Sequence, residues 1–179
     1  NVGKSTLFNR LVEQRKAIMD NESGITRDRH YGYAEWTGKH FTVIDTGGYV
    51  KNSTDIFESA IRQQVQIAID EASVILFLVD CKDGLTGLDK DFEAVLRDTC
   101  KPVLVVANKA DNVPNAIMAH DFYPLGMGAR YPTSAASGTG TGELLDEVIQ
   151  NFQDKDLIEE EAVPKVAILG RPNVGKSSF

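Results

Sequence analysis

The chain has 179 residues, 42% of them hydrophobic, which is enough apolar material for one globular core. Its net charge of −7 excludes a broad basic surface that would hold nucleic acid by neutralising phosphates. No apolar run reaches the roughly 18 residues that span a bilayer, and no signal peptide is evident, so we expect a cytoplasmic protein with no membrane partner. Cys81 and Cys100 lack metal-ligand spacing and are expected to be reduced thiols.

Short apolar runs alternate with helical patterns along the chain, which is typical of a parallel sheet wrapped by helices. The runs at Val74–Asp80 and Val103–Asn108 are apolar on both faces, as in buried parallel strands. The pattern therefore predicts an α/β fold with a doubly wound, mostly parallel sheet. The other predicted strands are Tyr31–Trp36, Phe41–Asp45, Arg130–Thr133 and Lys165–Leu169, and the predicted helices are Lys4–Glu13, Asp55–Asp70, Leu88–Asp98 and Gly142–Phe152.

A repeated motif stands near both ends of the chain. Asn1–Thr6 reads NVGKST, and Asn173–Ser178 reads NVGKSS after Gly170, which completes the phosphate-loop pattern G-x-x-x-x-G-K-[ST]. Such a loop directs backbone N–H groups at a phosphate, adds a lysine charge, and offers a hydroxyl to Mg²⁺. We therefore predict two nucleotide sites. Their candidate residues are Gly3, Lys4, Ser5 and Thr6 in the first and Gly170, Asn173, Gly175, Lys176 and Ser177 in the second, with Ser5 and Ser177 as Mg²⁺ ligands.

The base is indicated by the sequence NKAD at Asn108–Asp111, which includes Lys109 and directly follows a predicted buried strand. Asp111 can accept hydrogen bonds from both N1–H and N2–H₂ of guanine, whereas adenine has an acceptor at N1 and nothing at position 2. Ser134 and Ala135, after the last short strand of this unit, are expected to close over the guanine through backbone N–H groups. The alternative is a surface turn that spells NKAD by chance.

A γ-phosphate and Mg²⁺ site is indicated by two further segments. Asp45 and Gly48 fit the pattern D-x-x-G, in which the aspartate holds Mg²⁺ through water and the glycine N–H approaches the γ-phosphate. Thr26 lies in a polar loop at 22–29 and can offer its hydroxyl to Mg²⁺ and the γ-phosphate. The alternatives are an ordinary strand-to-loop turn at Asp45 and a threonine that merely begins a strand.

These motifs occur in the order of the translation-factor class of GTPases, and the segments NVGKSTLFNRL, GITRDR, DTGGY, NKAD and GRPNVGKSS resemble the Der/EngA family. Members of that family are bacterial GTPases with two tandem GTP-binding domains and a KH-like domain. The resemblance implies a Ras-like P-loop NTPase fold and a role in assembly of the large ribosomal subunit. It also implies contact with that subunit and its RNA, mainly through parts absent from this sequence.

The resemblance divides the chain into a first GTP-binding domain at 1–152, an acidic linker at 153–164, and the first strand and phosphate loop of a second domain at 165–179. A phosphate loop needs a strand before it, and the first loop has none in this sequence. Two explanations stay open. The strand lies upstream of Asn1, or Val166–Leu169 fills its place within one chain or by exchange between two copies.

The resemblance also implies the catalytic roles. Gly3 would give a loop N–H, Lys4 would bridge the β- and γ-phosphates, and Ser5 would bind Mg²⁺. Thr6 would reach the α-phosphate. Asn1 matches an asparagine that binds K⁺ between the phosphates in potassium-activated relatives, and the alternative is an asparagine that suits the turn. The catalytic candidates are thus Lys4, Thr26, Asn1 and Gly48, and the metal candidates are Ser5, Thr26, Asp45, Asn1 and Ser177.

Tyr49 stands where many GTPases have a water-orienting glutamine, so we expect slow intrinsic hydrolysis stimulated by K⁺. The cofactors implied are GTP or GDP, Mg²⁺ and K⁺. The main alternative is a guanine-nucleotide-binding module with negligible turnover. An ATP-dependent enzyme is a third interpretation, which Asp111 disfavours.

Overall fold

The computed structural model describes residues 2–13, 30–46, 65–112, 118–152 and 164–170. Short loops connect most of the described helices and strands, and residues 65–71 are also helical. The helices are α1 (Lys4–Glu13), α3 (Gly87–Arg97), the 3₁₀ helix η1 (Met118–Leu125) and α5 (Thr141–Gln150). The strands are β1 (His30–Trp36), β2 (Lys39–Asp45), β3 (Val74–Asp80), β4 (Val103–Asn108), β5 (Arg130–Pro132) and β6 (Lys165–Leu169).

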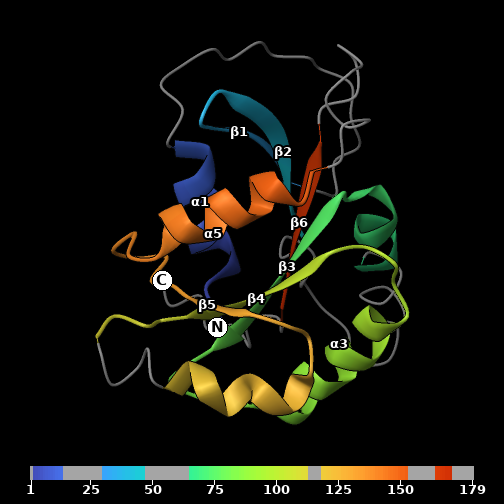
Figure 1. Ribbon diagram of the computed structural model, residues 1–179, viewed down its shortest axis with the longest axis vertical. Helices are drawn as coiled ribbons and strands as arrows, with labels where there is room; N and C mark the ends of the chain where they lie inside the picture. Colours follow the sequence, from blue (N-terminus) through green and yellow to red (C-terminus); the bar gives the residue numbers. More distant parts are fainter. Residues whose placement is uncertain (1, 14–29, 47–64, 113–117, 153–163, 171–179) are drawn as a thin grey trace, which may run out of the picture.

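The strands form one sheet in the order β1-β2-β6-β3-β4-β5, seen in Figure 1. Only the hairpin of β1 and β2 is antiparallel, and each of the other neighbouring pairs is parallel. The predicted α/β class and mostly parallel sheet are therefore confirmed. Because these strands run in the same direction, the carboxyl ends of β2, β3, β4 and β6 lie together at one edge of the sheet.

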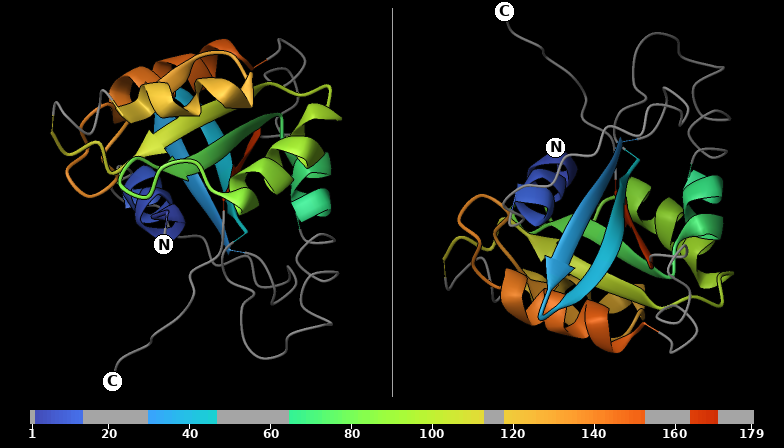
Figure 2. Two further views of the ribbon diagram at one scale, coloured as in Figure 1. Left: turned by 90° about the horizontal axis from the view of Figure 1, so that it is seen from below. Right: turned by 90° about the horizontal axis from the view of Figure 1, so that it is seen from above.

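The centre of the sheet is formed by the last described strand. β6, drawn in red in Figure 2, lies between β2 and β3 and pairs with Val43 on one side and Val74 on the other through Val166. Four of its five residues are buried, because the strand has neighbours on both edges and both faces. In the structure, Val166–Leu169 of the same chain therefore occupies the place of the strand before the first phosphate loop. The assignment of 165–179 to a second GTP-binding domain stays a prediction.

Apolar side chains alternate between the two faces of the sheet, and each face has its own buried cluster. The cluster under α1 and α5 includes Leu7, Leu78 and Val148, all fully buried. The cluster on the opposite face includes Phe77 and Phe122, and it joins the sheet to residues 65–71, α3 and η1. Both clusters hold the parallel strands, and therefore the residues at their carboxyl ends, in fixed positions.

Most predicted elements agree with the structure to within two residues. For the predicted helix Asp55–Asp70, only residues 65–71 are described. The sequence-based prediction missed η1, in which Phe122 and Leu125 are both buried and lie three residues apart, as the period of a 3₁₀ helix requires. Cys81 and Cys100 are both free thiols, as expected. No helix in the described ranges has the length and apolarity needed to cross a membrane.

Candidate functional site

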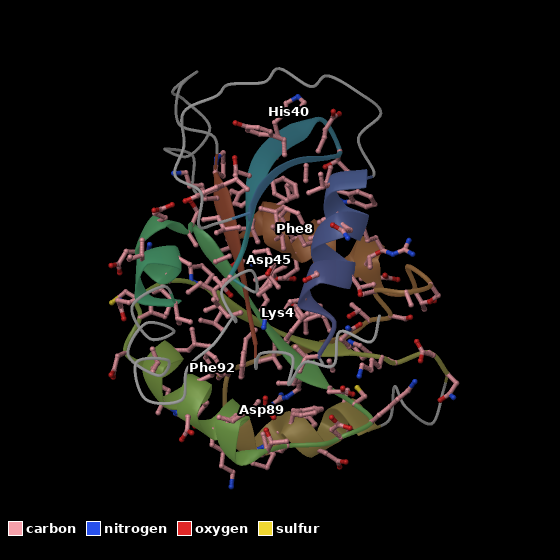
Figure 3. All side chains as sticks on the ribbon, turned by 180° about the vertical axis from the view of Figure 1, so that it is seen from behind. Lys4, Phe8, His40, Asp45, Asp89 and Phe92 are labelled. Atoms are coloured by element: carbon pink, nitrogen blue, oxygen red, sulfur yellow. The ribbon has the colours of Figure 1, made fainter. Side chains whose placement is uncertain are left out.

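The first phosphate loop leads into α1 at the carboxyl edge of the sheet. Gly3 has a φ of 90°, and a side chain there would collide with the amide of Asn108, so the position requires glycine. Lys4 follows at the start of α1, close to Asp45 (Figure 3). Its side chain is only 8% exposed, and Nζ donates a hydrogen bond to the Gly170 carbonyl at 2.7 Å.

Burial lowers the pKa of Lys4 from 10.5 to about 8, and the nearby charge of Asp45 only partly offsets that effect. The ammonium group is therefore poorly solvated, and an anion brought beside it would stabilise its charged form. This is the behaviour expected of a lysine that binds phosphate. Gly170 contributes its carbonyl here, at the end of β6, where a Cβ atom would lie 2.9 Å from the Leu78 carbonyl oxygen.

Ser5 and Asp45 meet beside Lys4. The Ser5 hydroxyl donates to Oδ2 of Asp45 at 3.3 Å, although the two residues come from α1 and from the end of β2. Asp45 is 4% exposed. A hydroxyl and a carboxylate are the hard oxygen ligands that Mg²⁺ prefers, so these two residues fit the predicted metal site. In the described ranges, no group of three or more His, Cys, Asp or Glu side chains is arranged to hold a metal ion.

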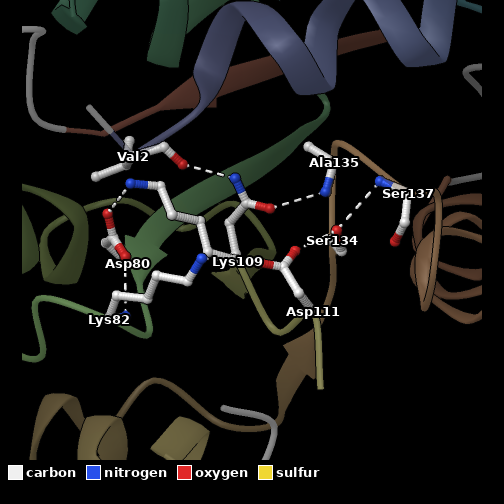
Figure 4. Close-up of polar contacts among 9 residues, drawn as sticks. Val2, Asp80, Lys82, Lys109, Asp111, Ser134, Ala135 and Ser137 are labelled. Carbon is white, nitrogen blue, oxygen red and sulfur yellow. Dashed lines mark hydrogen bonds and ion pairs between the residues drawn. The ribbon is translucent and has the colours of Figure 1, made fainter.

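Asn108 connects the phosphate loop to the loop predicted to close over the base, and Figure 4 labels its two partners, Val2 and Ala135. Its Nδ2 donates to the Val2 carbonyl at 2.7 Å, and its Oδ1 accepts from the Ala135 N–H at 2.9 Å. Asn108 is 3% exposed, so both hydrogen bonds are protected from water. One side chain thereby joins its own loop to two segments that are far away in the sequence.

Lys109 has a φ of 66°, a left-handed conformation that costs free energy in a residue with a side chain. Its Nζ lies 2.5 Å from Oδ2 of Asp80, a carboxylate with a fully buried side chain at the end of β3. The same carboxylate accepts the Lys82 N–H through Oδ1 at 2.9 Å. Asp80 therefore joins the loop after β3 to the loop after β4, and its ion pair holds Lys109 in the strained backbone conformation.

Asp111 lies next to Ser134 at the outer end of this arrangement. Oδ1 accepts from the Ser134 hydroxyl at 2.7 Å, and Oδ2 accepts from Lys82 Nζ at 2.8 Å. The hydrogen bond from Lys82 is the largest of the effects that lower the pKa of the Asp111 carboxyl group, and the hydrogen bond from Ser134 is the second. The hydrogen bond to Asp111 in turn raises the pKa of Lys82. The carboxylate is therefore ionised at neutral pH and accepts hydrogen bonds only.

Three side chains of this network were not predicted from the sequence. They are Asp80, Lys82 and Arg10 of α1. Arg10 donates through Nε to the Ala135 carbonyl and through Nη2 to the Ala136 carbonyl, both at 2.5 Å. A fork that holds two successive carbonyls fixes the orientation of the loop. The periodicity of α1 gives no signal for this role, because a helical arginine is usually solvated.

The predicted residues thus fall into two groups. The structure brings Gly3, Lys4, Ser5 and Asp45 together at one end of the site, and it joins them through Asn108 to Lys109, Asp111, Ser134 and Ala135. Gly170, which was predicted for the second phosphate loop, lies at the first one, against Lys4. Thr6 is exposed on the first turn of α1. The candidates Asn1, Thr26, Gly48, Asn173, Gly175, Lys176 and Ser177 lie outside the described residues.

The known proteins that are similar to this chain are GTPases, the class that its motifs indicate. A family model described as "50S ribosome-binding GTPase" matches residues 1–109. GTPase Der of Amoebophilus asiaticus is 68% identical over 180 residues, which cover 100% of this chain and 41% of that protein. GTPase Der of Cytophaga hutchinsonii is 62% identical over 182 residues, again covering 100% of this chain and 41% of the relative. The chain therefore spans about two fifths of the length of these curated relatives.

Solved structures with a similar fold include Era of Aquifex aeolicus bound to GDP and AlF₄⁻. It aligns with a TM-score of 0.64 and 26% identity over 99% of this chain and 57% of Era. The elongation factor SelB of Methanococcus maripaludis, in complex with the GTP analogue GppNHp, aligns with a TM-score of 0.55 over 84% of this chain and 31% of SelB. At 20% identity the match to SelB shows the fold alone.

Proposed function

Because the chain belongs to the family of 50S ribosome-binding GTPases, we propose that it binds GTP and hydrolyses it to GDP and phosphate as a molecular switch. The resemblance to the Der family indicated by the motifs is confirmed by the relatives named above. One observation carries the proposal. A single hydrogen-bonded path runs from the phosphate loop at Val2 through Asn108 to the loop of Ala135 and Ser134, and on to Asp111.

The two ends of that path suit the two ends of one nucleotide. At the first end, Lys4 is a buried cation, and the start of α1, directly after Gly3, offers helix N-terminal backbone N–H groups to a phosphate. At the other end, Asp111 is an ionised acceptor for N1–H and N2–H₂ of guanine, and the Ala135 loop is held in place by Arg10. A site of this kind is expected to favour guanine over adenine, because adenine offers no donors to the acceptor sites of Asp111 that Ser134 and Lys82 leave open.

Hydrolysis requires a water molecule to attack the γ-phosphorus while the bond to the β–γ bridging oxygen breaks. Lys4 would stabilise negative charge that develops on the phosphates. Ser5 and Asp45 would hold Mg²⁺, which supplies further charge neutralisation when it is bound. We further propose that Thr26 and Gly48 contact the γ-phosphate and that Asn1 binds K⁺, which would compensate for Tyr49 in place of glutamine.

Phosphate release under multiple turnover tests this proposal. The chain should release phosphate from GTP but not from ATP, and the rate should be higher in KCl than in NaCl. Asn1→Ala should remove the difference between the two salts while leaving GDP binding intact. Equal rates in KCl and NaCl for the unaltered chain would contradict the role of Asn1.

A guanine-nucleotide-binding module with negligible turnover is the second candidate function, and Tyr49 is the feature that favours it. Tight GTP binding without phosphate release in either salt would support this alternative. Tight ATP binding with no preference for GTP would contradict both functions and favour an ATP-dependent enzyme.

The family description leads us to propose that the protein acts in assembly of the large ribosomal subunit. The net charge of −7 makes a broad RNA-binding surface on this part unfavourable, so contact with ribosomal RNA would use other parts of a longer protein. Co-sedimentation with purified 50S subunits tests the partner. A protein of the relatives' full length should pellet with the subunits in the presence of a non-hydrolysable GTP analogue and much less in GDP, and no pelleting with either would contradict this role.

A further inference from the structure

Asp111 receives one hydrogen bond on each of its two carboxylate oxygens, from Ser134 on Oδ1 and from Lys82 on Oδ2. A carboxylate has about four lone-pair sites, two on each oxygen. The two donors from the protein therefore leave one site on each oxygen. The edge of guanine offers two parallel donors, N1–H and N2–H₂, and such a pair matches one remaining site on each oxygen.

We propose that Lys82 is a positioning residue for guanine recognition, which holds Oδ2 of Asp111 so that the carboxylate faces the base with one acceptor site on each oxygen. This inference rests on the proposed function, because it assigns Lys82 to the same base site. Lys82 would act through Asp111 and would not need to touch the nucleotide.

Lys82 is itself held in place at its backbone. Its N–H donates to Oδ1 of Asp80 at 2.9 Å, and the Asp80 side chain is fully buried at the end of β3. The neighbouring Cys81 N–H donates to the Asn108 carbonyl at 3.0 Å, which joins the Lys82 turn to the start of the NKAD segment. The lysine therefore starts from a fixed point, and only its side chain must be ordered to reach Asp111 (Figure 4).

The size of the effect follows from the exposure of the pair. The side chains of Lys82 and Asp111 are 52% and 41% exposed, so solvent screens their attraction. Exposed ion pairs of this kind change equilibria by at most about fivefold. We therefore expect Lys82 to adjust guanine affinity and not to decide whether the nucleotide binds.

The test compares Lys82→Met with Lys82→Arg and with the control Lys90→Met, which removes an exposed lysine of α3. The dissociation constants of GDP and IDP are measured for each protein by competition with a fluorescent nucleotide. IDP keeps N1–H and lacks the 2-amino group, so the ratio of the two constants reports the contact between Asp111 and that group. General destabilisation of the fold would weaken both nucleotides equally.

Lys82→Met should weaken GDP by about three- to fivefold, weaken IDP less, and so reduce the preference for GDP over IDP. Lys82→Arg should restore most of the preference, because the guanidinium can still donate to the carboxylate, and Lys90→Met should match the unaltered chain. An unchanged ratio in Lys82→Met would overturn the proposal, and so would tighter GDP binding, which would mean that Lys82 competes with the base. If the unaltered chain fails to prefer GDP over ADP, the proposed function itself fails.

Discussion

The buried charge of Lys4 makes the stability of the nucleotide-free chain depend on pH in a specific direction. The folded chain releases the Lys4 proton near pH 8, whereas the unfolded chain keeps it up to about pH 10.5. Between these values the unfolded state binds more protons, so the free energy of unfolding rises with pH. From pH 7 to pH 9.5 this contribution increases by about 2 kcal/mol when both pKa values are inserted in the linkage relation.

Lys4→Gln isolates that contribution, because glutamine cannot titrate but keeps an N–H donor at the end of its side chain, as Lys4 has toward the Gly170 carbonyl. The free energy of unfolding is measured by urea denaturation at several pH values for the two proteins. The difference between them should shift by about 2 kcal/mol in favour of the unaltered chain as the pH rises from 7 to 9.5. Lys90→Gln, at an exposed position, should give a curve parallel to the unaltered chain. Parallel curves for Lys4→Gln as well would refute the assignment of a poorly solvated ammonium at Lys4.

Two further predictions concern the elements that hold the site together. Arg10→Met should weaken GDP binding by about tenfold, because two carbonyls of the Ala135 loop lose their charged donor, and Arg10→Lys should recover only part of it. Fluorescence titration would measure both, and unchanged GDP affinity in Arg10→Met would contradict this role. Ile168→Ala should lower the free energy of unfolding by about 2–5 kcal/mol, since its side chain is fully buried in β6. A loss below about 0.5 kcal/mol in urea denaturation would mean that β6 does not occupy the centre of the sheet.

The elements that could be predicted from the sequence are those in which one physical signal dominates. Val74–Asp80 is apolar at nearly every position, and the structure places it at the centre of a sheet with both faces buried. The NKAD segment follows an equally apolar strand, and the structure places its Asn108 beside the phosphate loop, where Nδ2 donates to the Val2 carbonyl. Periodicity and motif spacing are local properties of the sequence, so they can be recognised without knowledge of the rest of the fold.

The parts that could not be predicted depend on contacts between distant segments. The sequence pattern shows that Val166–Leu169 is a strand, but only its pairing with β2 and β3 shows that it lies between them in the sheet. Lys82 is an ordinary turn lysine in the sequence, and it reaches Asp111 because β3 and β4 are neighbours in the sheet. The 3₁₀ helix η1 was missed because it is short and contains Pro124, which is more typical of a loop.

Guanine recognition by Asp111 is tested most directly by the substitution Asp111→Asn, with GDP and XDP as competing ligands. Xanthine carries a carbonyl in place of the 2-amino group of guanine, so an amide that can donate a hydrogen bond should suit it better than a carboxylate. The unaltered chain is expected to bind GDP more tightly than XDP, and Asp111→Asn should bind XDP more tightly than GDP. An Asp111→Asn protein that folds and still prefers GDP would contradict this assignment.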